Sequence, residues 1–282
     1  MKRNHNTQKV SFLVNKKLAI IVSLIIFCPI IFSYAIYYWE TTPQNYIDHS
    51  EYQYQQYIPV EGQKVVVICF DDGWQNQYDN ALPILNQYGF KATFGIITGY
   101  VDDNLPMYMS WREIVELALD GHDIASHTYN HKNLNFVDAA TINFELNKSV
   151  QDLEAYGIKA PVFIYPQGGG AGNATVESLV QHYFLVARST REATVHMDRS
   201  FDALNIPAYP IVNSTTFSDF LDMVNQAGNS TVPILFYHKI SDEVVSTATT
   251  QQMFAAEMQY LHDNGFTVMT MRDLFTIPIK PT

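Results

Sequence analysis

The stretch Lys64–Gln75, KVVVICFDDGWQ, joins a strongly apolar run to two adjacent carboxylates. Five apolar residues, Val65 to Cys69, follow one another without a polar interruption, as in a strand that is buried on both faces of a sheet. One aromatic residue later come Asp71 and Asp72. The stretch therefore predicts a central β-strand that carries two acidic side chains at its C-terminal end.

From Gln63 onward, short apolar runs alternate with helical patterns, which is typical of βα units and a largely parallel sheet. One expected helix lies in SWREIVELALDG, residues 110–121, where Ser110 and Glu113 have the spacing of a capping box. About seven strands alternating with helices predict an α/β fold, a distorted (β/α) barrel with its chemistry at the C-terminal ends of the strands. The expected strands are Val65–Phe70, Ala92–Ile97, Asp123–Ser126, Val162–Tyr165, Phe184–Ala187, Ile234–Tyr237 and Thr267–Thr270.

The N-terminal region has the pattern of a membrane anchor. Leu18–Trp39 contains 22 residues with two serines as its only mildly polar members, and about 20 apolar residues suffice to cross a bilayer as a helix. Basic residues precede this segment and acidic residues follow it, which places the N-terminus in the cytoplasm. We expect a cytoplasmic basic tail (1–17), a transmembrane helix (18–39), a linker (40–62) and an extracytoplasmic domain (63–282). The alternative is a cleaved signal peptide and a secreted domain.

The charge balance argues against one class of partner. Five of the 17 Lys and Arg side chains lie before the first acid, so the rest of the chain carries 12 basic against 28 acidic side chains. Proteins that bind nucleic acid need a basic surface that neutralises phosphates. We therefore expect no nucleic-acid partner.

A second polar group ends another predicted strand. The stretch HDIASHTYNH, residues 122–131, holds His127 and His131 four positions apart, a spacing that puts both imidazoles on one face of a helical turn. Two imidazoles and a carboxylate from another strand end make a three-ligand site with an open position, typical of a catalytic metal. Only one of Asp71 and Asp72 need bind the metal, and the other is then free to act as a general base.

A third group is His238, which ends the apolar stretch VPILFYHKI, residues 232–240. A histidine there is suited to protonate a leaving group, because its unperturbed pKa lies near neutrality. Taken singly, a strand-end aspartate can be a helix cap and a histidine a hydrogen-bonded structural residue. Three such features at the ends of three predicted strands favour a catalytic site.

In this order and spacing, CFDDG (69–73), SHTYNH (126–131) and LFYHK (235–239) resemble the motifs of the polysaccharide deacetylase family. This is the NodB-homology family, or carbohydrate esterase family four. The stretch ALPILNQYGFKATF, residues 81–94, resembles the segment that follows the family's first motif. The resemblance covers the chain from about Lys64 to Leu274 and implies the NodB-homology fold.

The resemblance also implies roles for individual residues. Asp71 is then the catalytic base, and His238 is the catalytic acid. Asp72, His127 and His131 bind one divalent metal ion, usually Zn²⁺, with Co²⁺, Ni²⁺ and Mn²⁺ as alternatives. The implied reaction removes N-acetyl groups from a cell-surface or extracellular polysaccharide with residues of the N-acetylglucosamine type.

The chain departs from the family pattern in its third and fourth motifs. IYPQGGG, residues 164–170, resembles the third motif, with Gln167 where a tyrosine is usual. The backbone N–H of Gln167 would donate a hydrogen bond to the oxyanion of the tetrahedral intermediate. Ile164 stands where the family often has an arginine that orients the base. Arg188 could reach the base from another strand, or be a surface residue. Trp74 either lines the substrate groove, where a sugar ring could stack on its indole, or has a packing role in the domain. The acid and tryptophan of the fourth motif are not evident.

Two other classes of function remain open. One is a different hydrolase on this scaffold, an O-acetyl esterase or another amidase. The other is a non-catalytic, membrane-anchored carbohydrate-binding protein. The intact set of five motif residues argues against the second, because loss of catalysis usually removes the base or a ligand. The expected partners are thus an N-acetylated polysaccharide and, through the N-terminal helix, the membrane.

Overall fold

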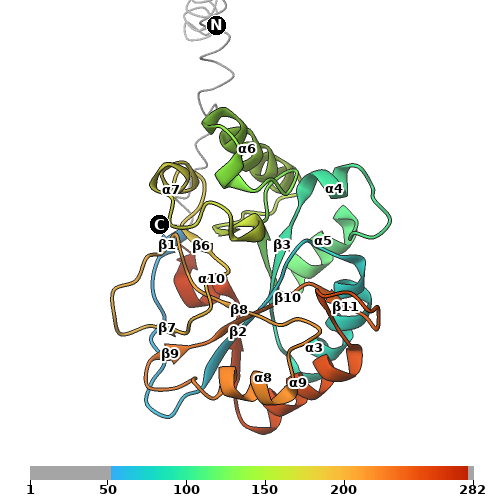
Figure 1. Cartoon of the computed structure of the whole chain (residues 1–282), viewed down its shortest axis with the longest axis vertical. Helices are drawn as coiled ribbons and strands as arrows, with labels where there is room; N and C mark the ends of the chain where they lie inside the picture. The colour runs from blue at the N-terminus through green and yellow to red at the C-terminus, as the bar shows by residue number, and fades with distance from the viewer. Residues whose placement is uncertain (1–51, 279–282) are drawn as a thin grey trace, which may run out of the picture. The chain divides into compact units, whose positions relative to one another are not determined.

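The computed structural model describes residues 52–278, and a parallel sheet lies at the centre of this part (Figure 1). The strand order is β6-β5-β4-β3-β2-β10-β8, and β13 also pairs with β2. These eight strands are parallel to their neighbours, so the expected parallel α/β sheet is confirmed. Their bounds are β2 Val65–Phe70, β3 Thr93–Ile96, β4 Asp123–Ser126, β5 Val162–Ile164, β6 Val186–Arg188, β8 Tyr209–Pro210, β10 Ile234–Tyr237 and β13 Thr267–Met269.

The central strand β2 is buried on both faces, as its sequence predicts. All six of its side chains have no exposed surface. Alternate residues serve two different cores because side chains alternate across a strand. Val65, Val67 and Cys69 belong to the core inside the curved sheet. The other three side chains, those of Val66, Ile68 and Phe70, belong to a second core that also contains residues of the surrounding helices.

The sheet forms a half-barrel with an open strand order, so the expected barrel is present only in part. β13 pairs with the first half of β2 and β3 with its second half, so the ladder is split along this strand. The edge strands β6 and β8 are linked by the irregular segment 203–208: Ala187 N donates to Ala203 O (2.8 Å), and Ser189 N donates to Ile206 O (2.8 Å). The sequence did not predict the two-residue strand β8, since two prolines, Pro207 and Pro210, interrupt the apolar residues around it.

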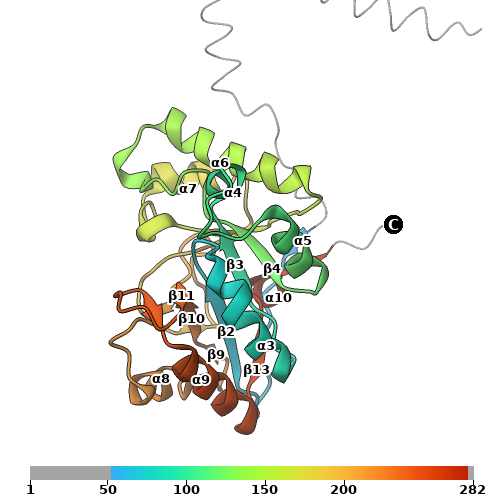
Figure 2. The same ribbon diagram turned by 90° about the vertical axis from the view of Figure 1, so that its right-hand side faces the viewer.

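Helices flank the sheet (Figure 2), with α6 and α7 at one end and α8 and α9 at the other. The capping box expected at Ser110 and Glu113 is present at the start of α5. The helices are α3 Leu82–Tyr88, α4 Thr98–Asp102, α5 Trp111–Leu119, α6 Ala139–Ala155, α7 Ala174–Val180, α8 Phe217–Val224, α9 Gln251–Asp263 and α10 Met271–Phe275, with short turns η2 Gln77–Ala81, η3 Leu134–Phe136 and η4 Pro166–Gly168.

Part of the stretch expected to be a linker lies against the domain. β1 (Tyr52–Tyr54) pairs antiparallel with β14 (Thr276–Pro278), and Tyr57 N donates to Leu274 O (2.9 Å). The expected transmembrane helix, 18–39, lies outside the described residues. Between residues 52 and 278, no helix is long and apolar enough to span a bilayer. The remaining short pairs are β7 Val195–His196 with β9 Thr231–Val232, and β11 Lys239–Ile240 with β12 Ala248–Thr249.

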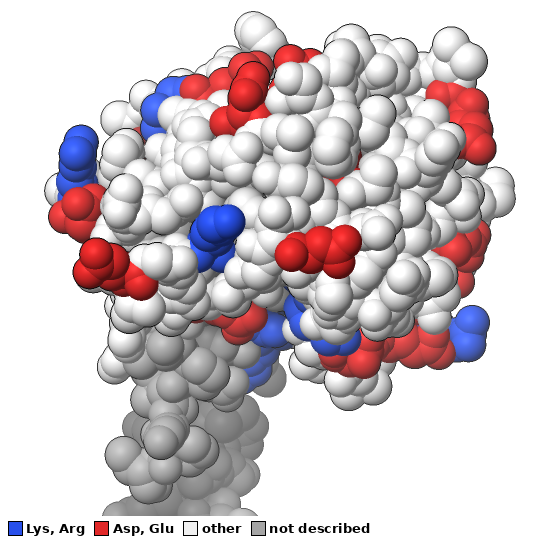
Figure 3. Space-filling view, turned by 90° about the horizontal axis from the view of Figure 1, so that it is seen from below, with Lys and Arg blue, Asp and Glu red and all other residues white. Residues whose placement is uncertain are grey.

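Charged side chains are interspersed on the face seen from below (Figure 3). Acidic and basic residues lie there singly or side by side among uncharged ones. This face therefore shows no continuous basic stripe of the kind that nucleic-acid binding requires.

Candidate active site

The register between β2 and β10 brings Asp71 and His238 together. Phe70 lies opposite Tyr237, and Asp71 N donates to Tyr237 O (2.9 Å). The next residue along each strand is therefore Asp71 on one side and His238 on the other. Side chains alternate along β2, and Asp71 falls on the same side as Val65, Val67 and Cys69. Its carboxylate therefore points to the inside of the curved sheet.

Gln77 fixes these two strand ends relative to each other. Its side-chain Nε2 donates to the carbonyl oxygens of Asp71 (2.6 Å) and His238 (2.8 Å). Gln77 is fully buried at the start of η2. Sequence reasoning missed it because a glutamine in a helical stretch reads as an exposed polar residue.

Asp71 is paired with a buried arginine. Arg188 Nη2 donates to both oxygens of the Asp71 carboxylate, at 2.6 and 2.5 Å. Arg188 has no exposed surface, and its guanidinium lies over the ring of Phe236, 4.2 Å from the centroid. The register of β5 and β6 places Arg188 opposite Ile164. An arginine from β6 thus enters the half-barrel beside the position where the family motif often has one.

Asp72, His127 and His131 converge on one point. Asp72 Oδ1 lies 3.4 Å from His127 Nε2 and 3.3 Å from His131 Nε2. One potential ligand atom from each residue lies within 4.8 Å of the others. Ligand atoms about 2.0–2.1 Å from a tetrahedral ion lie about 3.4 Å apart, so the two separations from Asp72 Oδ1 match a zinc-like site.

Two further observations fit a cation at this point. Asp72 Oδ1 is buried and finds no hydrogen-bond partner among the described residues. His127 Nδ1 bonds the carbonyl oxygen of Ile164 (2.8 Å), which only accepts, so Nδ1 carries the proton. His127 Nε2 then presents a lone pair toward Asp72 Oδ1, and a cation between them satisfies both.

The two histidines do not lie on a helical turn, so that expectation is wrong. They follow β4 in a bent loop whose kinks are residues in the left-handed region, Thr128 (φ 66°) and His131 (φ 58°). Asp72 also has a positive φ, 76°. Such conformations are costly without glycine and concentrate at functional sites. Here they turn the side chains toward one another.

Burial and neighbouring imidazoles set the charges of the ligands. Burial disfavours the charge on Asp72, but the surrounding imidazoles of His127, His238 and His131 lower its pKa below the ordinary value. Burial, together with His127, lowers the pKa of His131 to about 4. A carboxylate and a neutral imidazole are the forms that bind a metal ion.

Trp74 orients the carboxylate of Asp72. Its indole Nε1 donates to Asp72 Oδ2 (2.8 Å), which leaves Oδ1 directed at the histidines. The indole stacks on Tyr108 with 4.5 Å between ring centroids, and Lys239 Nζ lies 4.5 Å from its centroid. These contacts fit the packing reading of Trp74, and a role in sugar binding stays a prediction.

The third-motif segment lies against the chain that follows the histidine loop. Gln167 adopts a left-handed conformation (φ 56°, ψ 20°), and its Oε1 accepts a hydrogen bond from Asn133 Nδ2 (3.4 Å). A Cβ atom at Gly169 would lie 2.2 Å from Asn133 Oδ1, so only glycine permits this approach.

His238 Nδ1 is buried without a hydrogen-bond partner in residues 52–278.

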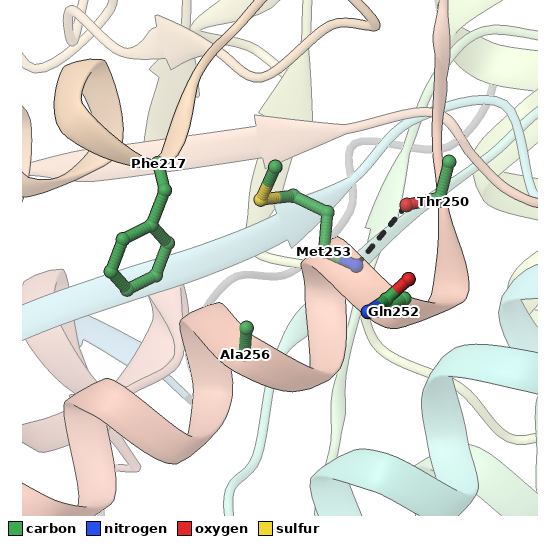
Figure 4. A pocket seen from close by; sticks show the side chains of 5 residues that line it. All are labelled: Phe217, Thr250, Gln252, Met253 and Ala256. Carbon is green, nitrogen blue, oxygen red and sulfur yellow. Dashed lines mark hydrogen bonds between the residues drawn. The ribbon is translucent and has the colours of Figure 1, made fainter.

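A separate hollow of about 360 Å³ lies beside α8 and α9 (Figure 4). Its lining carries no ionisable side chain and includes none of the strand-end residues. We assign it no part in the chemistry. The lining residues are Phe217, Thr250, Gln252, Met253 and Ala256.

The chain is similar in sequence to the polysaccharide deacetylase family. The family's sequence model, described as polysaccharide deacetylase, matches residues 59–186. This span contains the two aspartates and both histidines of the convergent set. His238 and Arg188 lie beyond the matched span, and the structure brings them to the same site.

Two relatives show how far the likeness in sequence extends. A gellan lyase of Bacillus sp is 29% identical over 167 residues, covering 57% of this chain and 6% of the relative. A poly-beta-1,6-N-acetyl-D-glucosamine N-deacetylase of Staphylococcus aureus is 38% identical over 117 residues, covering 36% of this chain and 40% of the relative. The chain therefore spans less than two thirds of the length of these relatives.

Solved structures share the fold. The Streptococcus pyogenes deacetylase PplD matches with a TM-score of 0.52 and 23% identity, over 58% of this chain and 72% of that one. The peptidoglycan deacetylase PdaC of Bacillus subtilis matches at 0.54 and 18%, over 76% and 90%. A Bacillus anthracis pseudoenzyme of the same family also matches at 0.54 and 18%, over 77% and 67%. Since one fold carries enzymes and a pseudoenzyme, function rests on the site residues.

Proposed function

We propose that the domain is a metal-dependent hydrolase that removes N-acetyl groups from N-acetylglucosamine-type residues of a cell-surface or extracellular polysaccharide. The observation that carries the proposal is the convergence of Asp72, His127 and His131 beside Asp71 and His238. The match to the family model supports the deacetylation, and the name of the staphylococcal relative supports this class of polymer.

Asp72, His127 and His131 would hold one divalent ion. Two imidazoles and one carboxylate suit Zn²⁺, and Co²⁺, Ni²⁺ or Mn²⁺ can use the same ligands. When bound, such an ion supplies Lewis acidity toward a carbonyl oxygen and toward water. Asp71 and His238 lie next to this set, at the ends of the paired strands β2 and β10.

Asp71 is the base in this proposal. Its carboxylate takes a proton from the water that attacks the acetyl carbonyl carbon. The Arg188 guanidinium, bonded to both oxygens, holds the carboxylate in place. The backbone N–H of Gln167 is the proposed donor to the oxygen that becomes negative.

His238 is the proposed acid. The carbon–nitrogen bond breaks as the amine leaves, and His238 gives the amine its proton, so acetate and a free amine result. Gln77 holds the backbone of His238 against that of Asp71, which keeps acid and base at a constant separation.

We further propose that residues 18–39 anchor the chain in the membrane with this domain outside the cytoplasm.

Acetate release by the purified protein tests the function. The substrates are a poly-N-acetylglucosamine, peptidoglycan and O-acetylated xylan, and Asp71→Asn is the inactive control. We expect acetate from an N-acetylated polymer with wild type only. Release from xylan alone would identify an O-acetyl esterase. Binding of a polymer without release from any substrate would identify a carbohydrate-binding protein.

A further inference from the structure

Helix α6 buries a polar stripe next to the histidine loop. Glu145, Ser149 and Asp152 are spaced by four and three residues, so they lie on one face of the helix. Their exposed fractions are 1%, 0% and 9%. A packing face is usually apolar, and buried polar groups are kept when they are hydrogen-bonded. The partners of this stripe therefore indicate its purpose.

Glu145 binds the loop at the residue before His131. Its Oε2 accepts a hydrogen bond from the backbone N–H of Asn130 (2.6 Å), and its Oε1 accepts one from Asn130 Nδ2 (3.0 Å). Both carboxylate oxygens are thus used by one residue. This two-point contact fixes the position and the orientation of Asn130.

The rest of the stripe holds the other side of the loop. Ser149 Oγ lies 2.7 Å from Ser126 Oγ, which accepts a hydrogen bond from Thr128 N (3.3 Å). Asp152 Oδ2 accepts a hydrogen bond from Thr98 Oγ1 (2.9 Å), and Thr98 N donates to Thr128 O (3.2 Å). The kinked loop is therefore held from α6 and α4 at once.

The loop needs such support because its conformation is costly. Thr128 and His131 are both left-handed, at about 1–2 kcal/mol for each residue that is not glycine. One local bond, from His131 N to Thr128 Oγ1 (3.0 Å), favours the kink. His131 is also the less buried of the two histidines, with 23% of its side chain exposed against 1% for His127. Packing alone therefore constrains His131 less.

We propose that Glu145 is a positioning residue for the metal site. Through Asn130 it holds His131 in the left-handed conformation that points Nε2 at Asp72 Oδ1. This inference rests on the metal site of the proposed function. It assigns a role to a residue that touches neither the ion nor the substrate.

Zinc affinity of the full-length protein, measured by competition with a chromophoric chelator, tests the role. Glu145→Gln keeps the shape but turns one acceptor into a donor that faces the Asn130 amide. Changes to residues that orient metal ligands cost about 10–100-fold in affinity, and we expect a loss in that range. Asn130→Asp sets two carboxylates against each other and should weaken zinc binding as well.

The double variant Glu145→Gln/Asn130→Asp should recover affinity. The new amide oxygen accepts the backbone N–H at position 130, and the new NH₂ donates to the new carboxylate, so both bonds return. A merely structural role would not produce this rescue in zinc affinity. Glu257→Gln is the matched control: Glu257 is a fully buried helix carboxylate bonded to Tyr237 OH (3.0 Å), and its replacement should leave zinc affinity unchanged.

Two results would overturn the proposal. One is a folded Glu145→Gln variant, judged by its thermal unfolding, that binds zinc as tightly as wild type. The other is a double variant that binds no more tightly than the single variants. A wild-type protein that binds no divalent ion would instead refute the metal site itself, and with it the proposed function.

Discussion

Replacing Arg188 by methionine removes the charge that faces Asp71 and keeps much of the side-chain volume. Arg188 is fully buried and Asp71 is 3% exposed, so water cannot replace the lost partner. Methionine is flexible and fills irregular space in a core. The main effect of Arg188→Met is therefore an unpaired carboxylate inside the half-barrel.

The contact geometry sets the size of the effect. Nitrogen–oxygen distances of 2.5 and 2.6 Å put the charge centres about 4 Å apart, an attraction of about 4 kcal/mol at an effective dielectric constant of about 20. Removing one member of a buried ion pair typically costs about 3–5 kcal/mol. We expect a loss of that size in the free energy of unfolding. Without the two hydrogen bonds from Arg188, the Asp71 carboxylate is also no longer held in position, so acetate release should fall by about 10²–10⁴-fold.

Urea unfolding and acetate release on the same preparations separate the two effects. The double variant Asp71→Asn/Arg188→Met has no buried charge at this point, so it should be more stable than Arg188→Met while remaining inactive. If Arg188→Met costs less than about 1 kcal/mol and the double variant is no more stable, the ion pair does not have the role assigned to it.

Three further predictions concern other parts of the site and the core. Asp72→Asn should lower zinc occupancy, whereas Asp71→Asn should retain zinc and lose acetate release; elemental analysis beside the rate would show the reverse pattern if the two roles were exchanged. Trp74→Phe removes the hydrogen bond to the metal carboxylate and should weaken zinc binding by about tenfold in a chelator competition. Trp111→Phe, which also removes an indole bond to a carboxylate, is its control and should not change zinc affinity. Burial raises the pKa of Glu257 to about 8 from 4.5, so the folded state keeps a proton that the unfolded state loses. The stability from this group is full below pH 4.5 and is lost as the pH rises to about 8, by up to about 1.4 kcal/mol per pH unit; Glu257→Gln should abolish that slope in urea unfolding.

The sequence alone predicted the strands of the sheet other than β8 and the polar residues at their ends. Val65–Phe70 reads as a strand buried on both faces because six successive apolar side chains suit only a sheet that is covered twice. The start of α5 was readable because a capping box is a local device of four residues. In a parallel sheet all C-terminal strand ends lie at one edge, so the grouping of Asp71, Asp72 and His238 also followed from the strand assignment.

Only the tertiary structure decided which residues support this set. Arg188 meets Asp71 across 117 residues because β5 and β6 pair with Ile164 opposite Arg188, and strand register is a property of the assembled sheet. The histidine loop likewise takes its left-handed kinks against the local preference of its residues. Glu145 on α6 reaches it from 15 residues away in sequence. Contacts of this kind leave no period or motif in the chain, because they depend on how separate elements pack.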